Sequence, residues 1–253
     1  TLQFSDKCII EGNGFELNIQ NGSIDIQPAS QLVLKNVVLK GVNGTNLKCA
    51  DDTASIELDN SRLVLSNYFT FTHGSLFFRN KNRIEGNHVF AYQSTQTSTV
   101  SRDAHLKLSN NITFSYDPLN FSKTLFEMID DSSELILDRA SFITTWSGID
   151  FTRGHIIVKR DSTIKSEILQ LPEEPNFDEV FIDDGISFGN RSNLDDVFVS
   201  ILAGVSLKVL GGSLNFKNTQ PDLIVPQNAL STIRMASNTT LRFFETMTFP
   251  LGS

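Results

Sequence analysis

The stretch SQLVLKN, residues 30–36, returns three times along the chain, as ASIELDN at 54–60, AHLKLSN at 104–110 and SELILDR at 133–139. Each copy places a small residue before two apolar residues that are separated by one position. A second phrase opens with glycine and has the same alternation, as GSIDI at 22–26, GSLFF at 74–78, GHIIV at 154–158 and GSLNF at 212–216. Apolar residues at every second position, bounded by turn-forming residues, indicate short strands with one buried face.

The intervals between the copies indicate how these strands are arranged. The steps from Leu32 to Ile56 and from Leu106 to Leu135 define a unit, and the other intervals are near-multiples of it. An antiparallel sandwich or barrel would also contain many short strands, but a repeat of this length favours a solenoid of stacked coils. We therefore predict an all-β fold, a single-stranded parallel β-helix of roughly nine to ten coils, as one domain over residues 1–253.

Asparagine and glycine supply a reason for the corners of such coils. Asn tolerates the left-handed backbone region and its amide can bond the local backbone, while Gly adopts that region without steric cost. Stacked Asn side chains could also bond one another as a ladder. The expected corner residues are Asn36, Asn60, Asn110, Gly22, Gly74, Gly154 and Gly212.

These features resemble the right-handed parallel β-helix superfamily, which includes pectate-lyase-like enzymes, phage tailspikes and the passenger regions of bacterial surface proteins. In addition, GGSL at 211–214 is similar to the GGA-(I/L/V) motif, and FFRN at 77–80 to the FxxN motif, of polymorphic outer-membrane protein passengers. The resemblance implies a right-handed coil and an extracellular or cell-surface location.

Charge, hydropathy and cysteine content bear on three features of the chain: its binding partners, membrane-spanning segments and disulfide bonds. The net charge is -8, and the 21 Lys and Arg residues are scattered singly along the sequence, so we expect no basic stripe and no nucleic-acid partner. The longest nearly apolar stretch, residues 197–207, is far shorter than the ~20 residues of a membrane-spanning helix, so we expect no transmembrane segment. Cys8 and Cys49 are separated by between one and two coils, which leaves both a buried free pair and a disulfide open.

An enzyme of this superfamily would need carboxylates beside a basic residue, because its lyases hold Ca²⁺ with acidic groups and its hydrolases use paired carboxylates. The candidates for such a catalytic site are Asp51, Asp52, Asp130, Asp131, Asp183, Asp184, Arg153 and His155. His155 occupies the slot of Ser23, Ser75 and Ser213 in the glycine phrase, which favours a corner role for it. The four His residues show no metal-binding spacing, so we expect no metal or cofactor, with Ca²⁺ only under the lyase alternative.

Four segments interrupt the strand rhythm and are expected to be loop insertions: 91–103, 116–131, 171–184 and 218–228. Insertions in a solenoid often form its binding face. The expected binding residues are Tyr92, Gln93, Gln96 and Trp146. We therefore predict a non-enzymatic secreted or surface-exposed β-solenoid for adhesion or scaffolding, which contacts a host or cell-surface protein or glycan. The alternatives are a lyase or hydrolase acting on an acidic glycan, and a trimeric tailspike-like fibre, although we expect a monomer.

Overall fold

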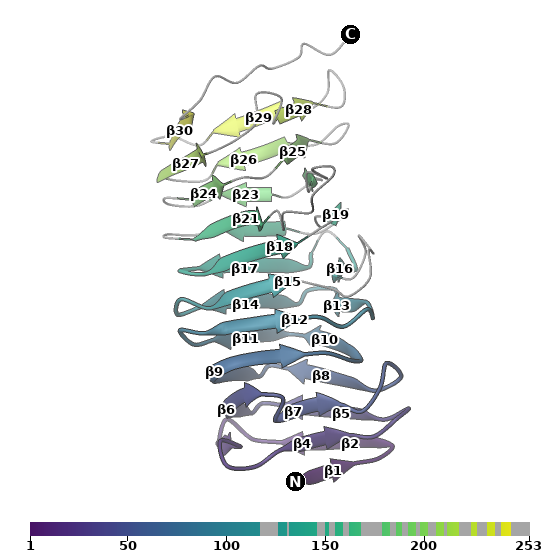
Figure 1. Ribbon diagram of the computed structural model, residues 1–253. Helices are drawn as coiled ribbons and strands as arrows, with labels where there is room; N and C mark the ends of the chain where they lie inside the picture. The colour runs from purple at the N-terminus through teal and green to yellow at the C-terminus, as the bar shows by residue number, and fades with distance from the viewer. Residues whose placement is uncertain are drawn as a thin grey trace, which may run out of the picture.

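The computed structural model describes residues 1–116, 126–130 and 132–145, followed by separate segments between residues 150 and 243. Side chains are described for residues 1–116, 127–130, 132–143, 157 and 162. Every strand pairing in these residues is parallel, and the strands stack along one axis (Figure 1). The chain is therefore an all-β parallel solenoid, as the repeat spacing predicted, and its described residues contain no helix.

The first sheet runs along one side of the solenoid. Its six strands, in stacking order, are β2 (Lys7–Glu11), β5 (Gln31–Lys35), β8 (Ser55–Asp59), β10 (Ser75–Arg79), β13 (Ser98–Val100) and β16 (Phe126–Met128). A four-stranded sheet has the order β19 (Asp150–Phe151), β22 (Glu179–Ile182), β25 (Phe198–Ile201) and β28 (Ile224–Pro226).

The second stack follows the first sheet along the chain in each coil. It contains β3 (Glu16–Asn18), β6 (Val38–Gly44), the first half of β9 (Arg62–Phe71), β11 (Lys81–Glu85), β14 (His105–Ser109), β17 (Glu134–Asp138), β20 (His155–Val158), β23 (Ile186–Phe188), β26 (Ser206–Val209) and β29 (Thr232–Met235).

The third side of the solenoid begins with a small sheet of β1 (Leu2–Phe4), β4 (Ile24–Ile26) and β7 (Leu47–Cys49). The second half of β9 then starts a longer stack with β12 (Val89–Tyr92), β15 (Thr113–Tyr116), β18 (Ser141–Thr145), β21 (Thr163–Glu167), β24 (Ser192–Asp195), β27 (Gly212–Lys217) and β30 (Thr239–Phe243).

The part of the solenoid in which most side chains are described, up to β18, has about five turns, fewer than the nine to ten coils expected for the whole chain. The expected number divides all 253 residues by the repeat and so treats the whole chain as coil. Strands β17 to β30 keep the parallel order, but segments such as 168–178 between them lie outside the described residues.

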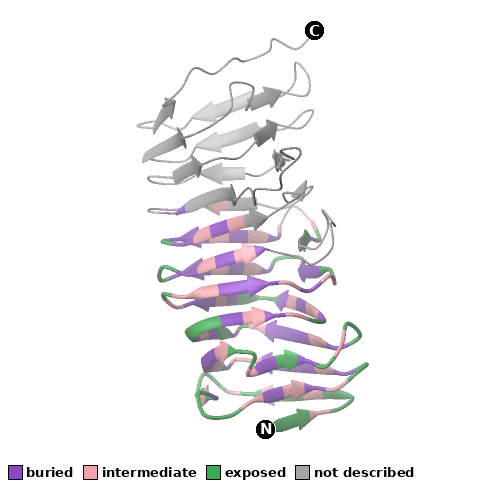
Figure 2. Cartoon of the chain, viewed as in Figure 1, coloured by how far each residue is buried: buried purple, intermediate pink, exposed green. Residues whose placement is uncertain are grey.

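The core consists of buried apolar residues that recur on successive strands, where buried residues are purple in Figure 2. Phe69, Phe90, Phe114 and Phe142 are register partners on successive strands, and their ring centroids are 4.9, 5.0 and 5.4 Å apart. Each is at most 1% exposed, and full burial of a Phe side chain contributes about 1.5–3 kcal/mol. Since Phe brings no polar atom that needs a partner, it suits this repeated stacking.

The corner between the first sheet and the second stack is built from asparagine. Asn36, Asn60 and Asn80 have φ of 50°, 52° and 58°, the left-handed region that Asn tolerates. Asn60 donates its amide to Oδ1 of Asn36 over 2.8 Å, so part of an amide ladder is present. Asn110, with φ of 59°, belongs to a different corner, between β14 and β15, and donates to Glu85 over 2.9 Å.

Glycine is required at only some of its expected corners. Gly74 has φ of 78°, and a Cβ there would lie 2.4 Å from the Ala54 oxygen. Gly22 lies in an exposed turn, its φ is not positive, and a Cβ there would meet nothing within 4 Å. Gly212 is the first residue of β27, and Gly154 lies outside the described residues.

The two sequence phrases do not correspond to two sides of the solenoid. Ile56 pairs with Leu76 of the next coil in the first sheet, whereas Leu106 pairs with Leu135 in the second stack. Consequently Ser75 pairs with Ser55, and His155 pairs with Glu134, so the expected equivalence of His155 and Ser75 is wrong. The phrases resemble each other because every side of the coil needs the same alternation.

The expected insertion 91–103 includes the end of β12 and all of β13. Segments 116–131, 171–184 and 218–228 contain β16, β22 and β28, and their remaining residues lie mostly outside the described residues. Cys8 and Cys49 are both free thiols and lie on different sheets, β2 and β7, so the disulfide alternative is wrong.

Candidate functional site

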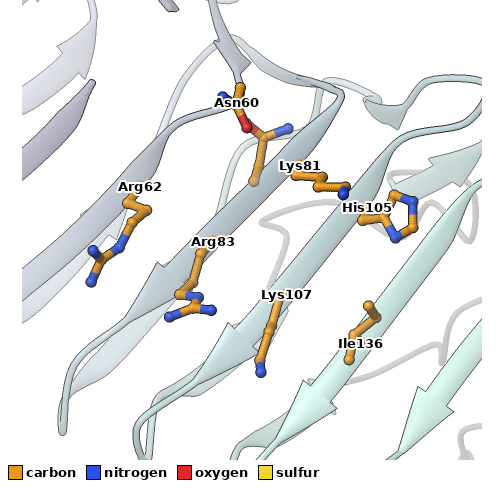
Figure 3. Close-up of a pocket in the computed structure, with 8 residues that line it drawn as sticks. Asn60, Arg62, Lys81, Arg83, His105, Lys107 and Ile136 are labelled. Atoms are coloured by element: carbon orange, nitrogen blue, oxygen red, sulfur yellow. The ribbon is translucent and has the colours of Figure 1, made fainter. Parts of the chain in front are cut away.

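Basic side chains form a row on the outer face of the second stack. Arg62, Arg83 and Lys107 are register partners on β9, β11 and β14, so their backbones follow one another at the ~4.8 Å spacing of paired strands. Lys81 and His105 form a second row two residues earlier on β11 and β14. Figure 3 shows both rows along the strands, with Ile136 of β17 at the end of the first row. We call this surface the basic groove.

The basic groove is a shallow hollow of about 390 Å³. Its lining consists of Asn60, Arg62, Lys81, Asn82, Arg83, His105, Lys107 and Ile136. The strand period explains the lining, because residues at every second position of β11 and β14 face outward while Ile84 and Leu108 between them are buried.

Carboxylates hold three of the groove's basic side chains through ion pairs. Glu85, only 3% exposed, accepts from Nη2 of Arg62, from Nη1 of Arg83 over 3.4 Å and from the Asn110 amide over 2.9 Å. Lys107 donates to Oδ2 of Asp138 over 2.5 Å. These carboxylates are therefore neutralised by the groove's own cations.

The basic groove also has a positive balance. His105 lies 2.7 Å from Glu134 across β14 and β17, and the structure gives Lys81 no ion-pair partner within the described residues. Four Lys and Arg side chains against the three carboxylates Glu85, Glu134 and Asp138 leave one net positive charge when His105 is neutral. On a chain of net charge -8, this surface stands out.

The expectation that basic residues are scattered without a stripe is therefore wrong for this side of the solenoid. The sequence places Arg62, Arg83 and Lys107 far apart. Each interval is one coil, so stacking brings them together. The coil interval, applied to charged residues as well as to apolar ones, predicts that these three side chains lie side by side.

The acidic doublets do not come together in the described residues. Asp51 and Asp52 precede β8, whereas Asp130 follows β16, so they lie at opposite edges of the parallel first sheet. They are also three strand spacings apart, about 14 Å along the axis. Asp131, Asp183, Asp184 and Arg153 lie outside the described residues, and only the backbone of His155 is described, in β20.

Asp51 and Asp130 each stabilise a turn. Hydrogen bonds from the hydroxyl and backbone N–H of Thr53 lower the pKa of Asp51 below its ordinary value. Ser132, and then Arg102, similarly lower the pKa of Asp130. These hydrogen bonds favour the ionised carboxylates of Asp51 and Asp130 and stabilise the two turns. Neither carboxyl group has the raised pKa of a general acid.

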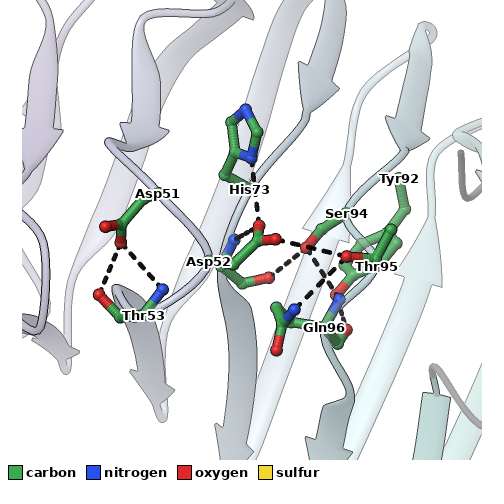
Figure 4. A network of polar contacts seen from close by, with 9 residues as sticks. Asp51, Asp52, Thr53, His73, Tyr92, Ser94, Thr95 and Gln96 are labelled. Carbon is green, nitrogen blue, oxygen red and sulfur yellow. Dashed lines mark hydrogen bonds and ion pairs between the residues drawn. The ribbon is translucent and has the colours of Figure 1, made fainter.

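Two of the expected binding residues, Tyr92 and Gln96, belong to a polar network at the corner before the first sheet (Figure 4). Tyr92 is fully buried, and its hydroxyl donates to the Gln96 carbonyl over 2.8 Å, with Ser98 Oγ 2.6 Å away. Burial raises the pKa of Tyr92 to about 12. Gln93 and Gln96 are half-buried, and Trp146 lies outside the described residues.

The exposed part of this network joins neighbouring coils. His73 Nδ1 lies 3.1 Å from Oδ1 of Asp52, and Thr95 donates to Oδ2 of Asp52 over 3.4 Å. Ser94, which is buried, donates to the Gly74 carbonyl over 2.5 Å. The network therefore holds successive corners together, and Tyr92 contributes from inside the coil.

In the part of the chain that the structure describes, no three His, Cys, Asp or Glu side chains gather where they could hold a metal ion. Within the same residues there is also no helix long and apolar enough to cross a bilayer. No family model, curated protein or solved structure matches the chain. The fold and the basic groove thus define a parallel β-solenoid with one basic groove on the outer face of its second stack.

Proposed function

We propose that the protein is a non-enzymatic β-solenoid of the cell exterior, acting in adhesion or as a scaffold, and that it binds an anionic glycan through the basic groove. The observation that carries the proposal is the row of Arg62, Arg83 and Lys107 on successive strands beside Lys81. Cations repeated once per coil match the acidic groups repeated along a carboxylated polysaccharide. This shifts the binding surface from the expected loops to the regular face of the coil.

The contacts of the groove favour binding over catalysis. Glycosidases and lyases of acidic glycans require carboxylates that remain available for proton transfer or for Ca²⁺. Glu85 and Asp138 are instead occupied by Arg62, Arg83 and Lys107. The guanidinium groups keep further donors for a carboxylate ligand, because each carries five N–H groups.

The fibre alternative receives less support. Three of the large apolar side chains that are exposed in the described residues, Leu2, Ile9 and Phe15, belong to the first coil. The other two, Tyr68 and Ile129, lie far from them along the chain. A lengthwise trimer interface requires an apolar stripe along the axis.

The proposal is tested by measuring the binding of the whole chain to a uronic-acid oligosaccharide, with a neutral dextran oligosaccharide as the reference. We expect binding of the uronate only, weakening as salt is added. Lys81→Glu/Arg83→Glu should weaken it at least about tenfold. This variant spares the buried Glu85, which keeps Arg62 and Asn110.

The matched control is Lys7→Glu/Lys48→Glu, which changes the net charge equally at two exposed residues of β2 and β7. We expect this control to keep the wild-type affinity. Equal losses in both variants, or uronate binding no stronger than dextran binding, would reject the proposal.

A further inference from the structure

A second hollow continues the basic groove toward the first coil. It measures about 440 Å³ and is lined by Asn13, Gly14, Asn36, Val37, Val38, Asn60 and Arg62. Asn60 and Arg62 line both hollows, so the two form one trough along the solenoid axis. The trough extends from the corner after β2 to Ile136 on β17. We call the second hollow the amide half of the trough.

The two halves offer different chemistry. The amide half has one charged side chain, Arg62, at its junction with the basic groove, and its polar side chains are the corner amides Asn13, Asn36 and Asn60. A carboxamide both donates and accepts hydrogen bonds, as a sugar hydroxyl does, whereas a Lys or Arg side chain only donates. The amide half therefore suits uncharged hydroxyl groups, and the basic groove suits acidic ones.

The amides are positioned and partly unoccupied. The bond from Asn60 to Asn36 uses the Nδ2 of one and the Oδ1 of the other, which leaves the Nδ2 of Asn36 and the Oδ1 of Asn60 without a protein partner in the described residues. The half-buried Val38 beside them supplies an apolar surface for the C–H face of a sugar ring. Positive φ at Asn13, Asn36 and Asn60 sets the direction in which each side chain leaves the backbone.

We infer that the trough binds a linear glycan along the solenoid axis, with uncharged sugar units over the amide half and carboxylated units over the basic groove. This inference rests on the proposed function, since it assigns the acidic end of the ligand to the same cations. It adds that the ligand is chemically mixed and that its orientation follows from the order of the two halves along the trough.

The experiment compares two probes on the whole chain. One is a trisaccharide of uronic acid units, and the other is a hexasaccharide in which three neutral hexose units are joined to that trisaccharide, prepared in both linkage orders. Wild-type protein should bind the hexasaccharide of one order at least about tenfold more tightly than the trisaccharide. Asn13→Gly/Asn36→Gly should remove that gain and keep the trisaccharide affinity, because neither residue lines the basic groove and Gly tolerates φ of 47° and 50°.

Asn80→Gly is the control, because Asn80 has φ of 58° at the same corner but lines neither hollow. Asn13→Gly provides a second test in the exposed turn, should the double variant fail to fold. Equal affinities of wild-type protein for the trisaccharide and both hexasaccharides would overturn the inference and leave the proposed function standing. Failure of wild-type protein to bind any of the probes would overturn both.

Discussion

Asn60 donates its side-chain amide to Oδ1 of Asn36 over 2.8 Å, although the two residues are one whole coil apart in the sequence. The bond joins the same corner of successive coils, and both residues have positive φ. A corner Asn in this fold therefore has two roles. Its backbone adopts the left-handed conformation, and its side chain links one coil to the next.

The two roles of Asn60 can be separated by substitution. Asn60→Ala should lower the free energy of unfolding by about 1–2 kcal/mol, because a Cβ without a local hydrogen bond is unfavourable at positive φ. Asn60→Gly should cost less, since it loses the bond to Asn36 but not the backbone conformation. Urea denaturation measures both, and an alanine variant as stable as the glycine variant would contradict the backbone role.

Gly74 should be intolerant of any side chain. Gly74→Ala places a Cβ 2.4 Å from the Ala54 oxygen and 2.7 Å from Sγ of Cys49, at φ of 78°. We expect a loss of about 1–3 kcal/mol or more in the free energy of unfolding. Gly22→Ala is the matched control, because a Cβ there has open space, and it should be neutral or slightly stabilising. Equal effects of the two substitutions would show that Gly74 is not in the packed corner.

The aromatic column should carry much of the stability of the solenoid. Phe90→Ala removes a ring that is 0% exposed and stacks 5.0 Å from Phe114, so we expect a loss of about 3–5 kcal/mol. Phe15→Ala, at a residue that is 76% exposed, should change the free energy of unfolding by less than about 0.5 kcal/mol. Comparable effects of the two variants in thermal denaturation would place Phe90 outside the core.

Stability should fall at alkaline pH. Burial raises the pKa of Cys49 from 9.0 to about 12 and that of Tyr92 from 10.0 to about 12. The folded state thus favours the neutral thiol and phenol, so this stabilisation is complete below pH 9 and is lost as the pH rises toward 12. Urea denaturation at several pH values should show a decline over this window that Cys49→Ala and Tyr92→Phe each reduce. A flat profile in the wild-type protein would contradict the burial of both groups.

The sequence predicted the fold class because the alternation of apolar residues and the one-coil interval are both local signals. The interval from Leu32 to Ile56, for example, is a true coil. It could not assign the sides of the coil, because turns of different length change the interval, which is shorter between Ile56 and Leu76 than between Leu106 and Leu135. Alternation alone is the same on every side.

The candidate site was less predictable. The acidic doublets were conspicuous in the sequence, but Asp51 and Asp130 lie in turns at opposite sheet edges and bond their own loops. Arg83 has basic neighbours in the sequence at Arg79 and Lys81, but Lys107 lies one coil further along the chain. Only the register of β11 against β14 places them together.

That register is the central claim, and disulfide trapping tests it most directly. In a Cys8→Ala background, Arg83→Cys/Lys107→Cys should form a disulfide on mild oxidation, because paired strands hold these Cα atoms about 4.8 Å apart, within the bridging range. Arg83→Cys/His105→Cys should not, because its two positions are offset by two residues and lie about 8 Å apart. Non-reducing peptide mapping distinguishes the two variants. A bridge in the second variant and none in the first would contradict the stacking that builds the basic groove.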